Sequence, residues 1–192
     1  MQVHKLAFTL SLSTILISCN FQILQQQEKQ APLETEQSNI SIPMKSAIEE
    51  LRVIKIKVES KEGINRKEYG ENLEDLVNIV AKADGNPKAL AAVKSAVEGH
   101  QLAYKFWQCN RIEGYEQLHE CQDKILQRVF VKYPDIATQA KSIVTGQNLT
   151  YISTGLDEEA VLKAIWQKTG EDTEVALQVV HPAPDTKLPV KK

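Results

Sequence analysis

The sequence predicts an all-α protein: a helical bundle of about five or six helices behind a disordered N-terminal tether. Apolar residues recur at spacings of three and four along most of residues 43–180, as they do on one face of a helix. Only eight glycines are present and aromatic residues make up 6%, whereas a β-sandwich or barrel usually has more of both. Short links separate the helical stretches, which is typical of a bundle.

Residues 1–18 have the pattern of a signal peptide. One lysine, Lys5, precedes Leu6 to Ile17, a run of twelve residues without charge. Twelve helical residues would span about 18 Å, too short to cross a hydrocarbon core of about 30 Å. A charged start, a short apolar run and a small residue at its end, Ser18, are typical of an export signal.

The signal ends in Leu16-Ile17-Ser18-Cys19, which resembles the lipobox of bacterial lipoproteins. The resemblance implies that the Cys19 thiol carries diacylglycerol, that the chain is cut just before it, and that lipid holds the mature protein on a membrane. Two or three acyl chains make a durable anchor, since each buried methylene contributes about 0.8 kcal/mol. The alternatives are an ordinary secretory signal cleaved nearby, and a buried N-terminal helix with a chance cysteine.

The residue after the cysteine bears on which membrane is used. In the enterobacterial sorting pattern, Asp at this position retains a lipoprotein in the inner membrane. Asn20 therefore favours the outer membrane, if the cell has one, but only this single residue supports that choice. The expected location is the periplasmic side of a membrane, outside the cytoplasm.

Two polar segments flank the predicted helical domain, residues 43–180. Residues 19–42 are rich in Gln, Glu, Ser, Thr and Asn, and too poor in apolar side chains to offset the entropy of ordering. Residues 181–192 contain three prolines and end in two lysines. We expect a flexible, lipidated tether before the domain and a disordered tail after it.

The first predicted helix begins near Pro43 and continues to Val58. Met44, Ile48 and Leu51 lie at helical spacing, and proline suits a first helical turn. Within it, residues 52–58 include an alternating apolar and charged run that a strand would also explain. Helix is our prediction for this segment, and strand remains the alternative.

The second and third helices form the clearest predicted hairpin. Asn65 followed by Glu68 resembles a capping box, and Gly85 suits a left-handed helix end. Asn86-Pro87 then restarts the chain with a cap and a first-turn proline. The third helix is expected to reach Trp107.

The remaining helices follow from similar signals. We expect a fourth helix from Gly114 to Tyr133 and a fifth from Pro134 that closes at Gly146. After a loop, a sixth should start at Thr154, with Asp157 three residues later, and end at Gly170. Residues 175–180 form a last apolar piece whose type the pattern does not fix.

The run from Gly63 to Tyr69 (Gly-Ile-Asn-Arg-Lys-Glu-Tyr) precedes an amphipathic helix. In this it resembles uncharacterised exported helical proteins of cyanobacteria. The resemblance covers the first two or three body helices and implies no activity.

Cys109 and Cys121 remain as a pair once Cys19 is committed to lipid. If the third and fourth helices turn at Gly114, the two cysteines lie opposite one another, and outside the cytoplasm such thiols usually form a disulfide. One continuous helix would instead hold them about 18 Å apart, too far to bridge.

A metal site from both cysteines with His119 and His100 is another alternative, but these residues lack the paired short spacings of a zinc site. We predict the disulfide, no metal and no cofactor.

Charge and motifs narrow the function classes. The formal net charge of -2 gives no basic footprint for nucleic acid. The sequence contains no G-x-S-x-G elbow, P-loop or H-E-x-x-H, and it predicts no catalytic residue. Its adjacent acids are typical of helix starts and solvated faces.

We therefore expect a membrane-anchored lipoprotein that acts as a non-catalytic binding or structural component of the cell envelope, with another envelope protein as its candidate partner. The alternatives are a lipid-anchored hydrolase with a carboxylate-based site, and a small-ligand or metal carrier.

Overall fold

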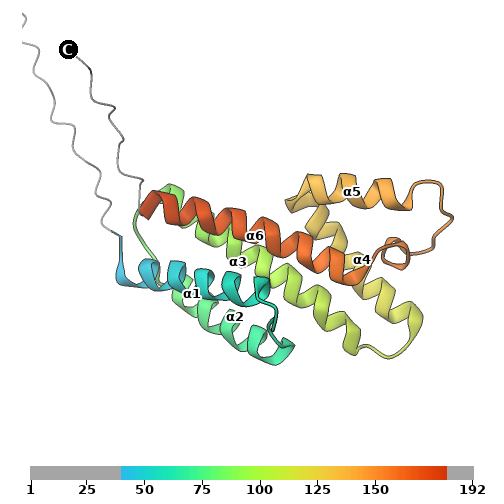
Figure 1. The fold of residues 1–192 in the computed structure, drawn as a ribbon, viewed down its shortest axis with the longest axis horizontal. Helices are drawn as coiled ribbons and strands as arrows, with labels where there is room; N and C mark the ends of the chain where they lie inside the picture. The colour runs from blue at the N-terminus through green and yellow to red at the C-terminus, as the bar shows by residue number, and fades with distance from the viewer. Residues whose placement is uncertain (1–39, 181–192) are drawn as a thin grey trace, which may run out of the picture. The chain divides into compact units, whose positions relative to one another are not determined.

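The computed structural model describes residues 40–180, and the predictions for the signal peptide, Cys19, most of the tether and the tail lie outside this range. Within it are six α-helices and two short 3₁₀ helices but no strand, so the predicted all-α helical bundle is confirmed. The elements are α1 (Ile42–Glu59), α2 (Arg66–Val80), α3 (Pro87–Gln108), η1 (Cys109–Arg111), α4 (Tyr115–Lys132), α5 (Pro134–Val144), η2 (Ile152–Gly155) and α6 (Glu158–Val180) (Figure 1).

The two longest helices, α3 and α6, lie side by side and form the centre of the bundle (Figure 1). Both helices bury small residues, including Ala96 and Gly99 on α3 and Thr173 and Ala176 on α6. A Cβ on Gly99 would lie only 2.2 Å from the Thr169 methyl carbon. The absence of a side chain at this position therefore allows the two helices to pack closely.

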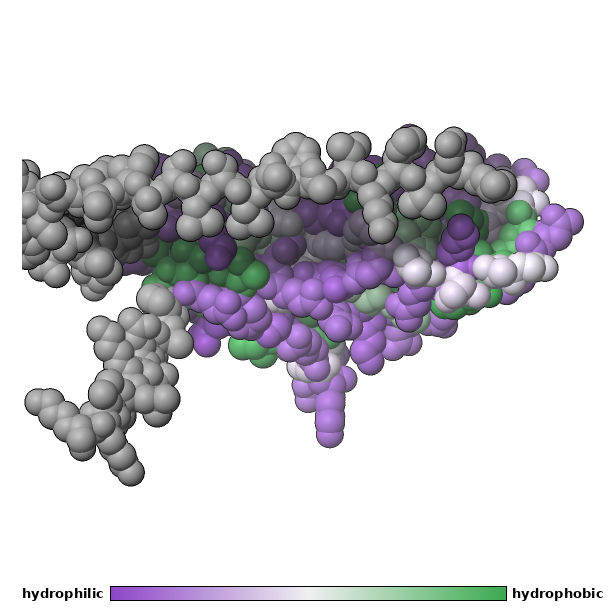
Figure 2. Space-filling view, turned by 90° about the horizontal axis from the view of Figure 1, so that it is seen from above, coloured by the Kyte–Doolittle hydropathy of each residue, from purple (hydrophilic) through white to green (hydrophobic). Residues whose placement is uncertain are grey.

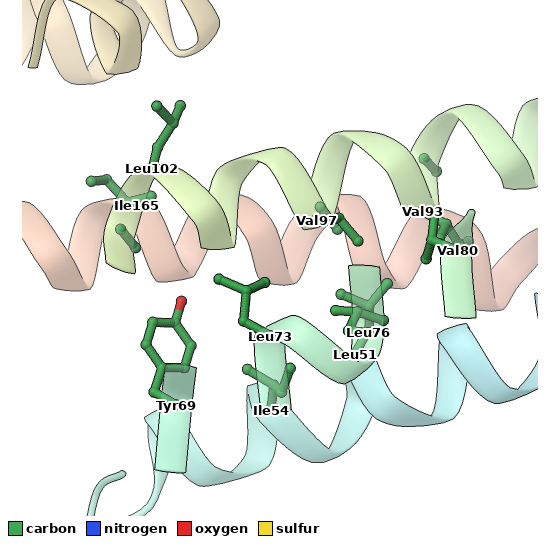
Figure 3. Close-up of a cluster of buried hydrophobic side chains, with 14 of the residues drawn as sticks. Leu51, Ile54, Tyr69, Leu73, Leu76, Val80, Val93, Val97, Leu102 and Ile165 are labelled. Atoms are coloured by element: carbon green, nitrogen blue, oxygen red, sulfur yellow. The ribbon is translucent and has the colours of Figure 1, made fainter. Parts of the chain in front are cut away.

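Helices α1 and α2 form a hairpin that packs on the central pair. Leu51 and Ile54 of α1, Leu73 of α2 and Val97 of α3 point into one shared core (Figure 3). The buried residues of α1 recur every three or four positions, so this face can pack only as a helix. The strand alternative for residues 52–58 is therefore wrong, and the predicted helix is confirmed.

Side-chain caps fix the starts of the first three helices. The Ser41 hydroxyl accepts a hydrogen bond from the Met44 amide at 3.2 Å and so caps α1. Asn65 accepts from the Glu68 amide at 3.0 Å, and the Glu68 carboxylate accepts from the Asn65 side-chain amide at 3.2 Å. The predicted cap at Asn65 is thus confirmed, although Glu68 bonds the side chain of Asn65 and not its backbone N–H, as a full capping box would. Asn86 caps α3 in the predicted way.

Both predicted boundaries of α6, its start at Thr154 and its end at Gly170, are wrong. The helix starts at Glu158, because the Asp157 carboxylate caps it by accepting from the Ala160 amide at 2.7 Å, while Thr154 belongs to η2. It continues through Gly170, which is buried, and includes residues 175–180. A Cβ at Gly170 would lie 3.2 Å from the Lys55 side chain of α1.

Hydrophilic residues cover most of the face drawn in colour in Figure 2, with hydrophobic residues in small groups between them. In residues 40–180, no helix has the length and apolar character needed to cross a membrane.

Candidate functional site

A cleft of about 870 Å³ lies between the N-terminal half of α2 and the C-terminal half of α3, and we call it the α2–α3 cleft. Its volume falls in the range of about 300–1,000 Å³ that is usual for small-molecule sites. Four cationic side chains line it, together with two carboxylates, three side-chain amides and two aromatic rings: Arg66, Lys67, Lys105, Arg111, Glu71, Glu74, Asn65, Gln101, Gln108, Tyr104 and Trp107.

The local fold explains how these groups come together. The Asn65 cap starts α2, so Arg66 and Lys67 stand in its first turn. Gly70 follows one turn later, and a Cβ there would lie 2.3 Å from the Tyr104 hydroxyl. This glycine therefore lets the Tyr104 side chain of α3 lie against α2.

Arg66 is held against the wall of the cleft. Its guanidinium carbon lies 5.2 Å from the centre of the Trp107 ring, within the range of a cation–π contact. Its Nε is buried and has no hydrogen-bond partner among residues 40–180. Within the same residues, neither Arg66 nor Lys105 nor Arg111 forms an ion pair, whereas Lys67 lies 3.8 Å from Glu71. Three cations of the cleft thus lack a carboxylate partner in the described part of the chain.

A buried polar network supports the wall from behind. The Tyr69 hydroxyl lies 2.8 Å from His100 Nδ1 and accepts a hydrogen bond from Trp166 Nε1 at 3.0 Å. The Trp166 ring in turn contacts Trp107 edge-to-face at 5.9 Å. These contacts join α2, α3 and α6, and they fix the ring on which Arg66 rests.

Burial shifts the pKa values of both network members. It lowers the pKa of His100 to about 4, because no charged partner compensates the cost of burying an imidazolium. It also raises the pKa of the Tyr69 hydroxyl above its usual value, and the hydrogen bond from Trp166 opposes this shift only in part. Both groups are therefore neutral at physiological pH, and the Tyr69 proton is well placed to bond His100 Nδ1. The Nε2 of His100 has no partner within the described residues.

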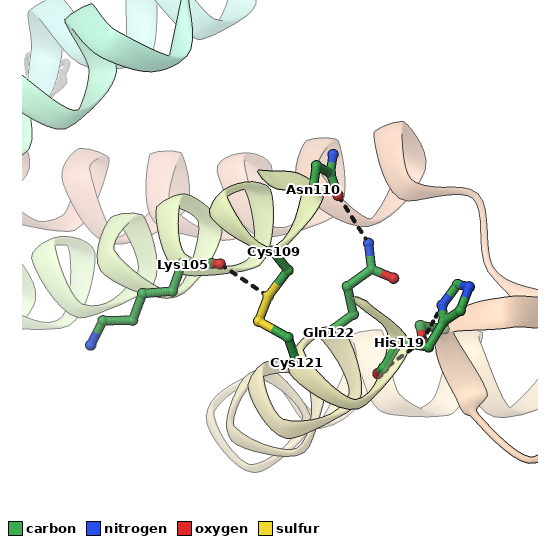
Figure 4. Close-up of a disulfide and its surroundings, with 7 residues drawn as sticks. Lys105, Cys109, Asn110, His119, Cys121 and Gln122 are labelled. Carbon is green, nitrogen blue, oxygen red and sulfur yellow. Dashed lines mark hydrogen bonds between the residues drawn. A yellow bond between two sulfur atoms is a disulfide. The ribbon is translucent and has the colours of Figure 1, made fainter. Parts of the chain in front are cut away.

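The two predicted cysteines are joined. Cys109 at the end of α3 and Cys121 on α4 form a disulfide with their Cα atoms 5.8 Å apart (Figure 4). Gly114, with a φ of 100°, lies between them in the sequence, directly before α4. The hairpin geometry behind the prediction is confirmed. The disulfide fixes the start of α4 to the end of α3, next to Arg111 of the cleft.

The other residues considered for a metal site lie apart. His119 Nδ1 is 3.0 Å from the Ser153 hydroxyl, while His100 is enclosed in the network around Tyr69. In residues 40–180 no three His, Cys, Asp or Glu side chains gather in a way that could hold a metal ion. The structure thus does not bring together the four residues of the metal alternative.

Four of the adjacent acids in the sequence have structural partners. Glu49 pairs with Arg52 at 3.0 Å, and Glu171 pairs with Lys168 at 2.9 Å. Asp172 accepts a hydrogen bond from the Ser95 hydroxyl at 2.7 Å, and Glu158 accepts one from the Asn110 side chain. None of these acids lines the α2–α3 cleft.

No known protein family, curated protein or solved structure matches this chain. The resemblances of the first nineteen residues and of the run from Gly63 to Tyr69 therefore stay predictions. That run nevertheless supplies Asn65, Arg66 and Lys67 to the cleft and Tyr69 to the network behind it. We did not predict the cleft from the sequence. The signals that could have indicated it were the cationic pair Arg66 and Lys67 at a helix start, and Trp107 close to Arg111 in the sequence.

Proposed function

We propose that this protein is exported, is anchored in a membrane by lipid on Cys19, and acts outside the cytoplasm as a non-catalytic binding component of the cell envelope. The Cys109–Cys121 disulfide is the observation that carries this proposal. Disulfides persist mainly in oxidising compartments and are rare in the cytoplasm. This support for export is independent of the lipobox-like residues.

The composition of the α2–α3 cleft favours binding over catalysis. Its groups are cations, amides and aromatic rings, which hold a ligand by charge, hydrogen bonds and stacking. A carboxylate-based hydrolase needs two acids in distinct environments facing the bond to be cut. Of the two carboxylates here, Glu71 is paired with Lys67 and Glu74 has no ion-pair partner in the described residues. The cleft also contains no Ser, Cys or His that could form a nucleophile–base pair.

The anchor can be tested by lipid labelling in cells that produce the full chain. When the cells are fed radiolabelled palmitate, the wild-type protein should incorporate label and Cys19→Ala should incorporate none. Cys121→Ala is the matched control, because it also removes one thiol but should leave the labelling intact. Equal label in wild type and Cys19→Ala, or none in either, would rule out the proposed anchor.

A further inference from the structure

The α2–α3 cleft is locally cationic although the whole chain carries a net charge of -2. Four cations and two carboxylates line it, and one of those carboxylates is already close to Lys67. Arg66, Lys105 and Arg111 form no ion pair within residues 40–180. A ligand that enters between them therefore meets three uncompensated positive charges and one negative charge, from Glu74.

From this arrangement we infer that the α2–α3 cleft is a binding site for a phosphate ester, with Arg66, Lys105 and Arg111 as its phosphate-binding side chains. The inference rests on the proposed function, because it gives the binding role a ligand class. Guanidinium groups match the paired oxygens of phosphate with two parallel hydrogen bonds, and lysine adds a point charge. The first turn of α2 also lines the cleft, where the positive end of a helix favours an anion.

A phosphate monoester fits the charge better than a carboxylate does. It carries about -1.5 to -2 at neutral pH and three strong acceptor oxygens, whereas a carboxylate carries a single charge on two oxygens. Three free cations match the larger charge. The volume of about 870 Å³ exceeds what the phosphate group alone would fill, so an organic body should occupy the remainder beside Gln101, Tyr104 and Gln108.

The site is largely organised before a ligand arrives. Arg66 lies over Trp107, and Trp107 is held edge-to-face by Trp166, whose Nε1 is bonded to Tyr69. The disulfide fixes the end of α3 next to Arg111. A side chain that is already oriented loses less freedom on binding, which favours affinity.

Calorimetric titration of the full-length protein in dodecyl maltoside, a detergent without phosphate, tests the site with sn-glycerol 3-phosphate as the probe. Saturable binding is expected, and it should weaken as salt is added because the contacts are ionic. Arg111→Gln should reduce the affinity by about tenfold, the usual effect of removing one charged hydrogen-bond partner. Arg111 is exposed in η1, so this substitution should leave the fold intact, which circular dichroism checks.

Two further substitutions sharpen the result. Arg52→Gln is the matched control, because Arg52 is an exposed arginine of α1 outside the cleft and its loss should leave the affinity unchanged. Glu74→Gln should instead raise the affinity, since it removes the unpaired carboxylate that repels the ligand. Equal weakening by Arg52→Gln and Arg111→Gln would overturn the inference, because it would show only a general charge effect.

Micelles that carry phosphatidic acid, compared with micelles that carry diacylglycerol, distinguish a lipid headgroup from a soluble ester. If phosphatidic acid displaces glycerol 3-phosphate and diacylglycerol does not, the site binds a lipid headgroup. No competition by either lipid, with glycerol 3-phosphate still bound, would assign it to a soluble ester. Failure of both phosphate probes to bind would refute the site. Palmitate labelling does not depend on this titration, so the anchor and the ligand class can fail separately.

Discussion

His100 is the residue on which the acid stability of the bundle most directly depends. It is fully buried, its Nδ1 faces the Tyr69 hydroxyl, and its Nε2 has no partner in residues 40–180. The Tyr69 ring packs edge-to-face on the imidazole with the ring centroids 5.8 Å apart, and burial lowers the pKa of His100 to about 4. A protonated His100 would place an uncompensated charge in the core.

We therefore predict that the unfolding free energy falls as the pH drops from 6.5 to about 4. In that range the unfolded chain binds a proton at His100 and the folded chain does not, so acid favours unfolding. The loss from this residue should total about 3 kcal/mol and should level off below the folded pKa. Urea unfolding across the range measures it.

The control for this prediction uses the second histidine of the described helices. His100→Gln should remove most of the histidine-dependent slope, while His119→Gln should keep it, because His119 is only half-buried beside Ser153. An identical slope in the wild type and in His100→Gln would show that the carboxylates, not His100, set the acid sensitivity.

Tyr69 is the centre of the same network. Tyr69→Phe keeps the ring but leaves His100 Nδ1 and Trp166 Nε1 without their shared partner. Since an unsatisfied buried group costs about 1–3 kcal/mol, we expect a loss of stability of that order in thermal or urea unfolding. Tyr115→Phe, at an exposed tyrosine, should change little. Equal effects of the two substitutions would contradict a structural role for the network.

At the scale of the elements, the sequence predicted most of the helices and missed boundaries that depend on packing. Regular apolar spacing and local caps predicted α1 and α2, because both signals lie within each helix. The end placed at Gly170 was wrong, because α6 continues through this glycine while it packs on α3 and α1, and a local stop signal does not reveal that packing. Thr154 and Asp157 could each cap a helix, and the chain uses Asp157.

Two glycines inside helices should respond in opposite ways to alanine. At Gly99 a new Cβ would lie 2.2 Å from the Thr169 methyl carbon and 2.3 Å from the Tyr133 hydroxyl, so α3 and α6 must separate. Such overpacking usually costs about 1–3 kcal/mol, which exceeds the helix-propensity gain. At Gly170 the nearest atom is the flexible Lys55 side chain at 3.2 Å.

Gly99→Ala should therefore destabilise the protein in urea unfolding, whereas Gly170→Ala should be neutral or should stabilise it by up to about 1 kcal/mol. If Gly99→Ala were the more stable of the two, the close contact between α3 and α6 would be refuted.

The disulfide stabilises the α3–α4 hairpin. Its sequence separation is 12, and closing a loop of this size contributes about 3 kcal/mol in the chain-entropy model. The double substitution Cys109→Ala, Cys121→Ala should lower the unfolding free energy by about that amount. Reduction of the wild type with dithiothreitol should have a similar effect and should not affect the double variant. A double variant as stable as the oxidised wild type would contradict this role.

At the scale of the whole molecule, the sequence predicted the disulfide but not the cleft. Cys109 and Cys121 lie symmetrically about Tyr115, next to Gly114, so a local turn is enough to pair them. The cleft instead needs Arg66 and Arg111, which are far apart in the sequence and belong to different helices. Their juxtaposition follows from the way α2 packs against α3, which no local pattern reveals.

We propose that anchor, disulfide and cleft belong to one arrangement. In it, a lipid would hold the chain at a membrane, the oxidised helical body would lie outside the cytoplasm, and the cationic cleft would bind its ligand there. Export is the part on which the others depend. A cytoplasmic protein would keep Cys109 and Cys121 reduced, and its Cys19 would not receive diacylglycerol.

Intact-mass spectrometry of the protein purified without reductant from cells that make it naturally tests export most directly. We predict that the purified chain begins at Cys19, carries the mass of attached diacylglycerol, and lacks the two hydrogens lost when Cys109 and Cys121 are joined. A chain that still begins at Met1, without lipid and with every thiol free, would contradict it.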